Sequence, residues 1–156
     1  MANFEISISK EKVLEEVSRT TAYAGSKSNG TLDFKKVATT KGDNNMTALF
    51  WTEAAGIILS LCRRFIASHV SKDENSDSNF DITLDMPANF NTSQKKSIIA
   101  EIFSFFVSYI VSRWLKFSDK SEASDYMNEA LNRIGSVREK LFQRIKPSRK
   151  ADSENK

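Results

Sequence analysis

The sequence is constrained most by one apolar run, SIIAEIFSFFVSYIVSRWLKF, which extends from Ser97 to Phe117. A helix that crosses a membrane needs about 20 mostly apolar residues with few or no charges. Glu101 lies near the start of this run, Arg113 and Lys116 lie near its end, and the uncharged stretch between Glu101 and Arg113 is too short to span a bilayer. We therefore expect a helix buried inside a soluble fold, in preference to a membrane span or an amphipathic helix on a membrane surface.

On a helical wheel, this run separates a narrow polar arc from a wide apolar face. At about 100° per residue, the polar arc contains Ser97, Glu101, Ser104, Ser108 and Ser112. A helix that is apolar around most of its circumference is typically buried. Small residues along one edge would also let a second helix approach closely, and this edge consists of Ala100, Ser104, Ser108 and Ser112.

Length and composition indicate one soluble globular domain. A chain of 156 residues has a single-domain length, and 40% hydrophobic with 28% charged residues is ordinary for a soluble protein. The opening MANFEISISK has neither the basic start nor the apolar segment of a signal peptide, so we expect a cytoplasmic protein. The single cysteine, Cys62, cannot form an internal disulfide, and we interpret it as a small core residue and not a nucleophile.

Apolar periodicity predicts a mainly α fold, a helical bundle of about four helices with a small two-strand β element. Alternation predicts strands over Phe4–Ile8 and Phe80–Met86, which pair either with each other or with a strand of another subunit. The helical pattern predicts four helices: from Lys10 to Ala24, from a capping Asp43 to about Val70, through the apolar run, and from a break at Phe117–Glu122 to just before Pro147. We expect residues 1–147 to form the single helical domain and residues 148–156 to form a disordered basic and polar tail.

No complete catalytic or metal-binding motif is present in the sequence. His69 is the only histidine, and its predicted place at the C-terminal end of a helix favours capping over catalysis. Asp81 and Asp85 share one face of a strand and could bind a cation, although a solvated strand face is the preferred interpretation. Neither GxxxxGKS/T nor GxGxxG occurs. We therefore assign no catalytic, cofactor-binding or metal-binding residue and expect no enzymatic activity, no cofactor and no small-molecule substrate.

Basic residues gather near the C-terminus, although the formal net charge is only +3. From Arg133 to Lys150 the chain has seven basic residues and one acid, Glu139. Such a region could bind nucleic-acid phosphates, could fit an acidic protein surface, or could be a solvated helix face. These three alternatives stay open. The candidate partner or nucleic-acid contacts are Arg138, Lys140, Arg144, Lys146, Arg149 and Lys150.

Two stretches resemble a known family. TTKGDNNMTALFWTEAAGIILSLCRRFI, from Thr39 to Ile66, resembles the long helix of tailed-phage head–tail connector (adaptor) proteins. The later order of strand, buried helix and YMNEALNRIGSVREKLFQRIKPSRK resembles the remainder of such proteins, and also uncharacterised small proteins of Bacteroides phages and prophages. The resemblance spans about Phe4 to Lys150 and rests on element order. The polar loop Ser71–Asn79 matches no connector feature, and no functional residue is carried over.

The resemblance implies a virion structural protein that forms a homo-oligomeric ring between portal and tail. Its expected partners are copies of itself and portal or tail proteins, with possible non-specific DNA contact and no membrane. It would be found in the virion, and in the host cytoplasm during assembly. The alternative is a small helical nucleic-acid-binding or regulatory protein that uses its basic C-terminal helix, with Arg138, Lys140, Arg144 and Lys146 as the contacts.

Overall fold

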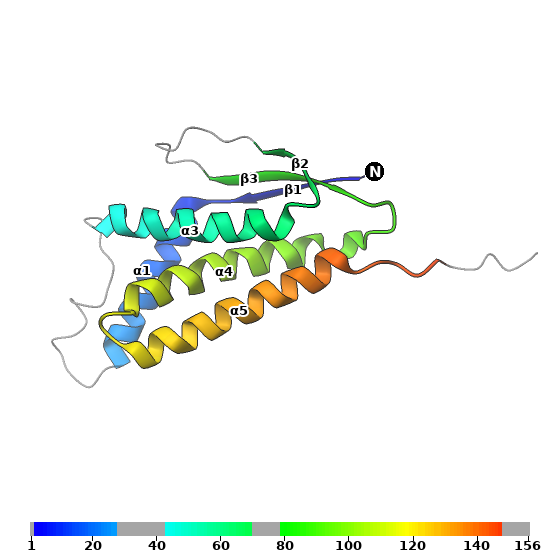
Figure 1. The fold of residues 1–156 in the computed structure, drawn as a ribbon. Helices are drawn as coiled ribbons and strands as arrows, with labels where there is room; N and C mark the ends of the chain where they lie inside the picture. Colours follow the sequence, from blue (N-terminus) through cyan, green and yellow to red (C-terminus); the bar gives the residue numbers. More distant parts are fainter. Residues whose placement is uncertain (1, 28–42, 70–78, 148–156) are drawn as a thin grey trace, which may run out of the picture.

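The computed structural model describes residues 2–27, 43–69 and 79–147, which form a mainly α fold with a small antiparallel sheet (Figure 1). The strands, in the sheet order β1-β3-β2, are β1 (Ala2–Ile8), β2 (Ile66–His69) and β3 (Phe80–Met86). The helices are α1 (Lys10–Lys27), α3 (Asn44–Cys62), α4 (Lys95–Leu115) and α5 (Lys120–Phe142), with a short 3-10 helix, η2 (Thr92–Gln94), before α4. The predicted helical bundle with a small β element is therefore confirmed.

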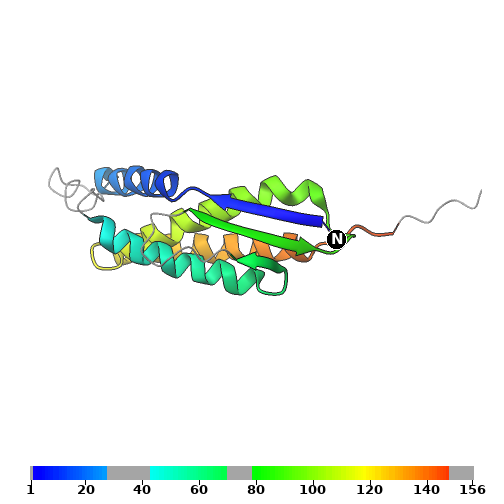
Figure 2. The same cartoon turned by 90° about the horizontal axis from the view of Figure 1, so that it is seen from above.

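The elements form layers around α4. The sheet lies on one side of α4 and α5 lies on the other, while Figure 2, which looks down on the sheet, places α1 and α3 on opposite flanks. α4 contacts α1, α3, α5 and β1. Its side chains Ile98, Ile102, Phe106 and Ile110 are completely covered by these elements. The prediction that the apolar run is a buried helix is thus confirmed.

Two helices are nevertheless long and apolar enough, by length and composition, to cross a membrane: Asn45–Cys62 and Thr92–Leu115. The second helix meets this criterion because the stretch from Ile98 to Leu115 contains only two charged residues. The longer run from Ser97 to Phe117 contains three, and the sequence analysis therefore does not favour a membrane span. The core helix of a soluble protein meets the same criterion, and 56% of this window is buried, against 33% of the window in α3. α3 is therefore the apolar helix with the larger uncovered surface.

β1 and β3 pair with each other along their whole lengths, from Ala2 opposite Met86 to Ile8 opposite Phe80. Successive residues of a strand point to opposite faces of the sheet. Every second side chain of β1 and β3 therefore packs against the helices. The buried set is Phe4, Ile6 and Ile8 from β1 with Phe80, Ile82, Leu84 and Met86 from β3. The alternative of pairing only with another subunit is excluded for these two strands.

The sheet has a third strand, which sequence analysis missed. The helix predicted to reach about Val70 ends at Cys62, and β2 pairs with β3, with Ile66 opposite Leu84. Phe65 and Ile66 keep the apolar spacing of α3, but the backbone groups of this segment bond to β3 instead, as in the bond from the Asp85 N–H to the Phe65 carbonyl at 2.6 Å. His69 consequently lies on a strand, and the predicted helix-capping role is wrong.

The predicted small-residue edge of α4 is buried only in its C-terminal half, where it packs against α5, whereas Ala100 is exposed. Ser108 and Ser112 are buried at 4% exposure each, and the Ser112 hydroxyl donates a hydrogen bond of 2.9 Å to the carbonyl of Ala123 in α5. α5 contributes small residues of its own, Ala123 and Ala130, both buried. Small side chains on both helices let the two backbones approach, and the α4–α5 contact is the most extensive in the molecule.

Helix ends differ from the prediction in several places. α1 continues through Gly25 to Lys27, and Asp43 makes no side-chain capping bond at the start of α3. Asp119 does cap α5, because its carboxylate accepts from the N–H of Glu122 at 3.1 Å. α5 ends at Phe142, short of Pro147, because the chain then runs extended and the Ile145 N–H donates to the Asn89 carbonyl at 2.9 Å. The predicted tail, residues 148–156, and most of the polar loop Ser71–Asn79 lie outside the described residues.

Candidate interaction surfaces

The possible cation site on β3 has no third ligand among the residues that the structure describes. Asp81 is exposed and accepts a hydrogen bond from the Ser7 hydroxyl, whereas Asp85 is half-buried, with one oxygen that lacks a hydrogen-bond partner. Within residues 2–27, 43–69 and 79–147, no group of three or more His, Cys, Asp or Glu side chains is arranged to hold a metal ion. Asp81 and Asp85 are therefore polar residues on the outer face of the sheet.

Cys62 is a core residue, as the sequence predicts. Its side chain has 0% exposure at the end of α3, and burial raises the pKa of its thiol from 9.0 to about 12. The thiolate is the nucleophilic form of cysteine. A thiol with this pKa remains protonated at neutral pH. Because the folded state has the raised pKa, ionisation begins to favour the unfolded state only as the pH rises above about 9 towards 12.

We expect the Cys62 thiol of the native protein to resist the disulfide reagent DTNB at pH 8, and to react fully once the protein is unfolded in guanidinium chloride, because only unfolding exposes it. A matched control moves the thiol onto an exposed side of the same helix, in the variant Cys62→Ala/Thr52→Cys. This control should react completely within the dead time of manual mixing. Equally fast labelling of Cys62 in the native protein would show that the C-terminal end of α3 is accessible to the reagent and that Cys62 is not buried.

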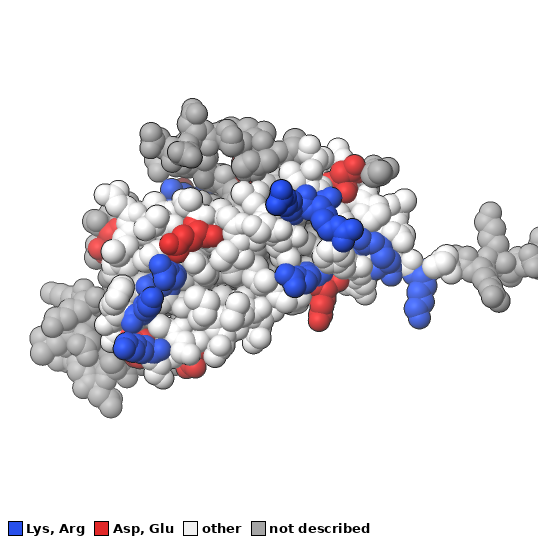
Figure 3. All heavy atoms as spheres, viewed as in Figure 1, with Lys and Arg blue, Asp and Glu red and all other residues white. Residues whose placement is uncertain are grey.

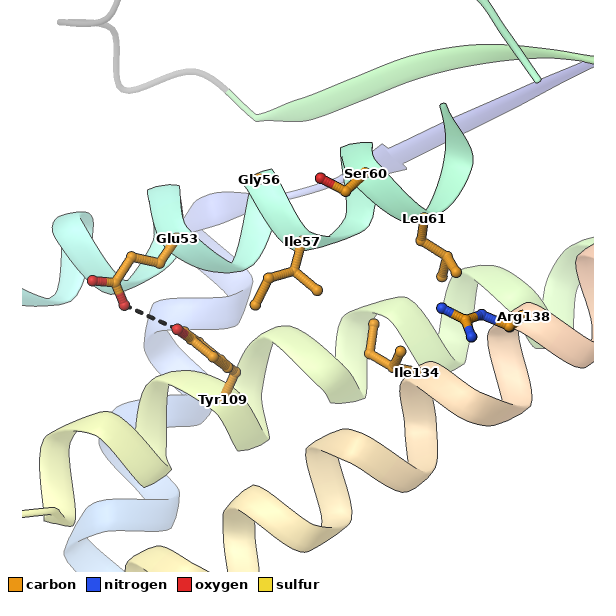
Figure 4. A pocket seen from close by; sticks show the side chains of 8 residues that line it. All are labelled: Glu53, Gly56, Ile57, Ser60, Leu61, Tyr109, Ile134 and Arg138. Carbon is orange, nitrogen blue, oxygen red and sulfur yellow. Dashed lines mark hydrogen bonds between the residues drawn. The ribbon is translucent and has the colours of Figure 1, made fainter. Parts of the chain in front are cut away.

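A surface groove of about 550 Å³ lies between α3 and α5, with α4 as its floor (Figure 4). α3 contributes four small or apolar residues and one acid, α4 contributes a tyrosine, and α5 contributes an isoleucine and an arginine. The lining residues are Glu53, Gly56, Ile57, Ser60, Leu61, Tyr109, Ile134 and Arg138. We call this feature the α3–α5 groove.

One end of the α3–α5 groove is polar. The Tyr109 hydroxyl donates a hydrogen bond of 3.0 Å to Glu53 Oε2, and Arg113 Nε lies 3.2 Å from the same oxygen, although poorly aligned for a hydrogen bond. The Arg113 guanidinium also stacks on the ring of Phe50, 5.3 Å from its centroid. Desolvation raises the pKa of Tyr109, and the hydrogen bond to Glu53 and the charge of Glu53 raise it further. This end of the groove is thus a cluster of polar side chains that are paired with one another.

The walls of the groove continue as apolar stripes along both helices. On α3, Met46, Leu49 and Ile57 are 53%, 57% and 37% exposed, and their spacing places them with Gly56 and Ser60 on one arc of the helix. On α5, Leu131 is 60% exposed and lies one turn before Ile134. Sequence analysis missed this surface, because periodicity showed that α3 is apolar but not that one of its faces is left uncovered.

The basic residues predicted as contacts divide into three groups. Lys140 is used inside the fold, since its ammonium lies 3.0 Å from Glu101 Oε2 and donates to the Ser97 hydroxyl at 2.6 Å. Arg144 donates to the carbonyls of Leu141 and Gln143 at the end of α5. Arg138 and Lys146 are exposed. Arg149 and Lys150 lie outside the described residues.

Two further arginines lie at this end of the molecule. Arg63 and Arg64 are exposed in the turn between α3 and β2. The next residue, Phe65, contacts Phe142 edge to face at 5.3 Å, and the Arg144 guanidinium lies 5.9 Å from the centroid of the Phe65 ring. Sequence analysis missed these two residues because it placed them inside a longer helix. The signal that could have found them is the Arg-Arg pair itself.

Comparison with known proteins adds no identification. No family model matches the chain, and neither a curated protein nor a solved structure matches it. The functional conclusions therefore rest on the fold, the α3–α5 groove and the basic residues.

Proposed function

We propose that this protein is a structural assembly subunit that docks onto another folded protein through the α3–α5 groove, in the simplest case onto a second copy of itself. The setting that we propose is the ring of a tailed-phage head–tail connector, between portal and tail proteins in the virion. This assignment draws on the resemblance in element order between residues 4 and 150, and on the groove. We propose no enzymatic role.

The observation that carries the proposal is the uncovered apolar face of α3. A helix that is apolar around its circumference is stable when it is covered on all sides. α3 packs against α4 and buries Ala54 and Ile58, yet leaves Met46, Leu49 and Ile57 exposed to water. Contiguous exposed apolar surface of this kind is typical of protein–protein interfaces. A protein partner that covers this face would bury these three apolar side chains.

The groove is better suited to a protein partner than to lipid. A helix that lies on a membrane surface typically carries lysines and arginines around its apolar face. α3 has no basic residue within Asn44–Cys62, and the apolar stripe is interrupted by the acid Glu53. Arg138 places a positive charge at one point of the groove, away from the paired Glu53 and Arg113, and this charge can fix the orientation of a partner. The connection of α3 to α5 across α4 also provides a firm surface for docking.

We expect a photoreactive benzophenone side chain at position 57 to crosslink the protein to a second copy, because Ile57 lies in the groove and is 37% exposed. Leu131→Lys should reduce this crosslink at least tenfold, since it places a charge in the apolar wall. Tyr23→Lys, which changes a side chain of the same 60% exposure on α1, is the matched control and should leave the crosslink intact. Crosslinking is read by denaturing gel and mass spectrometry.

The virion setting is tested separately, by mass spectrometry and cryo-EM of phage particles from cells that carry the gene. The proposal predicts the chain in the particles at ring stoichiometry. Flotation of the purified protein with lipid vesicles, abolished by Leu49→Lys, would instead assign the apolar stripe to lipid. A strict monomer that is absent from particles would contradict the assembly role.

A further inference from the structure

We infer that the basic end of the molecule binds the phosphate backbone of nucleic acid without reading its sequence. The surface, which we call the arginine end, consists of Arg63, Arg64, Arg138, Arg144 and Lys146. It shares Arg138 with the α3–α5 groove, whereas the remaining four residues do not line that groove, so nucleic-acid binding can be tested apart from the proposed assembly role. Figure 3 shows lysine and arginine side chains gathered on the visible face near the start of the C-terminal tail.

The fold assembles the arginine end from two segments that are distant in sequence, 63–64 and 138–146. Phe65 holds the α3–β2 turn against the end of α5, because its ring contacts Phe142 at 5.3 Å and supports the Arg144 guanidinium at 5.9 Å. Arg63 and Arg64 directly precede Phe65. Arg138, one helical turn before Phe142, points across the α3–α5 groove towards Leu61 of α3 (Figure 4). Lys146 follows the short bridge between Phe90 and Arg144.

The arginines of the arginine end differ from the other described arginines because they form no ion pair with a described carboxylate. Of the seven arginines in the described part of the chain, three lie within 4.0 Å of a carboxylate: Arg19 beside Glu16, Arg113 beside Glu53, and Arg133 beside Glu101 and Glu129. The other four have no carboxylate partner among the described residues, and all four belong to the arginine end. Unneutralised guanidinium groups on one surface attract a polyanion and release its condensed counterions when it binds.

The chemistry of the surface favours nucleic acid over an acidic protein. Arginine presents a planar fork of donors that fits phosphate oxygens in pairs, which a single ammonium does not. An aromatic ring lies among these forks, because Phe142 is 41% exposed beside the arginines. Exposed aromatic rings within a basic surface are the usual platform on which unpaired bases stack. An acidic peptide would use the charges but would leave this ring without a role.

The test is fluorescence anisotropy of the full chain with a labelled duplex and a labelled single strand, titrated at several salt concentrations. The variant replaces Arg63, Arg64, Arg138 and Lys146 by Gln. Each lost phosphate contact should reduce the slope of log K against log salt by about 0.9 for duplex DNA. The variant should therefore lower the slope by about 3 to 4 and weaken binding at low salt at least 100-fold.

The matched control removes the same charge elsewhere, with Lys12, Arg19, Lys116 and Lys120 replaced by Gln. These four residues are exposed on α1 and at the α4–α5 turn. The control should keep the wild-type slope within about one unit. Tighter binding of the single strand would assign the Phe142 ring to base stacking, and tighter binding of the duplex would assign recognition to the phosphates alone.

Three results would overturn the inference: no binding of either probe at low salt, equal losses in the variant and the control, or equally effective competition by polyglutamate at matched charge. The last result would assign the arginine end to an acidic protein surface. All four substituted side chains are exposed, so thermal unfolding of the variant should stay close to that of wild type.

Discussion

Replacing Phe106 by alanine is expected to lower the free energy of unfolding by about 3–5 kcal/mol. Phe106 has 0% exposure in the middle of α4, and its ring joins three elements. It stacks on Trp51 of α3 with centroids 4.3 Å apart, and it meets Phe80 of β3 at 5.5 Å. Alanine would leave a cavity that closes only if α3, α4 and β3 all move. Relaxation would therefore recover little of the lost free energy of unfolding.

Phe117→Ala is the matched control, because Phe117 is 90% exposed just beyond the end of the same helix. Removing its ring should change the free energy of unfolding by no more than about 0.5 kcal/mol. Both variants are measured by urea unfolding, followed by tryptophan fluorescence and by circular dichroism. Comparable losses in the two variants would mean that Phe106 does not join α3, α4 and β3. If Phe106→Ala does not fold, Phe106→Leu should show a smaller loss of about 1 kcal/mol.

The sequence predicted α4 and its neighbour well, because both predictions used local patterns. The apolar face of the run required burial, and the small residues at Ser108 and Ser112 required a close helix. Strand alternation likewise predicted β1 and β3, whose buried residues alternate with polar ones along each strand. In each case the pattern depends on residues within the element itself.

The end of α3 could not be predicted in this way. Phe65 and Ile66 continue the apolar period of a helix, and the sequence contains no local stop signal before them. The structure ends the helix because β2 gains hydrogen bonds to β3, which is distant in sequence. Tertiary pairing of this kind overrides helical periodicity. The same error hid Arg63 and Arg64 inside the predicted helix and gave His69 a helix-capping role.

The candidate surfaces could be predicted only in part, because periodicity does not show which faces are covered. Leu49 and Ile57 follow the same apolar helical spacing as Ile58, yet they are exposed and Ile58 is buried. In the basic region, the sequence counted charges but did not show their partners. Glu101, the only charge in the polar arc of α4, was the available clue that a cation of α5 would be used inside the fold.

Lys140→Met is expected to lower the free energy of unfolding by about 2–3 kcal/mol. Glu101 is only 14% exposed and receives the Lys140 ammonium at 3.0 Å, together with hydrogen bonds of 2.8 and 2.9 Å from the Ser136 hydroxyl. Removing the ammonium leaves a carboxylate between two packed helices without its main counter-charge. Breaking a fully buried pair costs about 3–5 kcal/mol. Here the loss is smaller because Lys140 is 25% exposed and Arg133 lies 4.0 Å from Glu101.

The matched control for this loss is Arg138→Met, which removes a cation two residues earlier that is exposed and has no described partner. It should change stability by no more than about 0.5 kcal/mol. The double variant Glu101→Leu/Lys140→Met removes both charges and should recover most of the loss of Lys140→Met, because an apolar pair of similar volume replaces an ion pair without a desolvation cost. The single variant Glu101→Leu is measured beside it. A double variant whose loss equals the sum of the losses of Glu101→Leu and Lys140→Met would mean that Glu101 and Lys140 do not interact. Recovery would establish that Lys140 stabilises the α4–α5 contact and is not available to a partner.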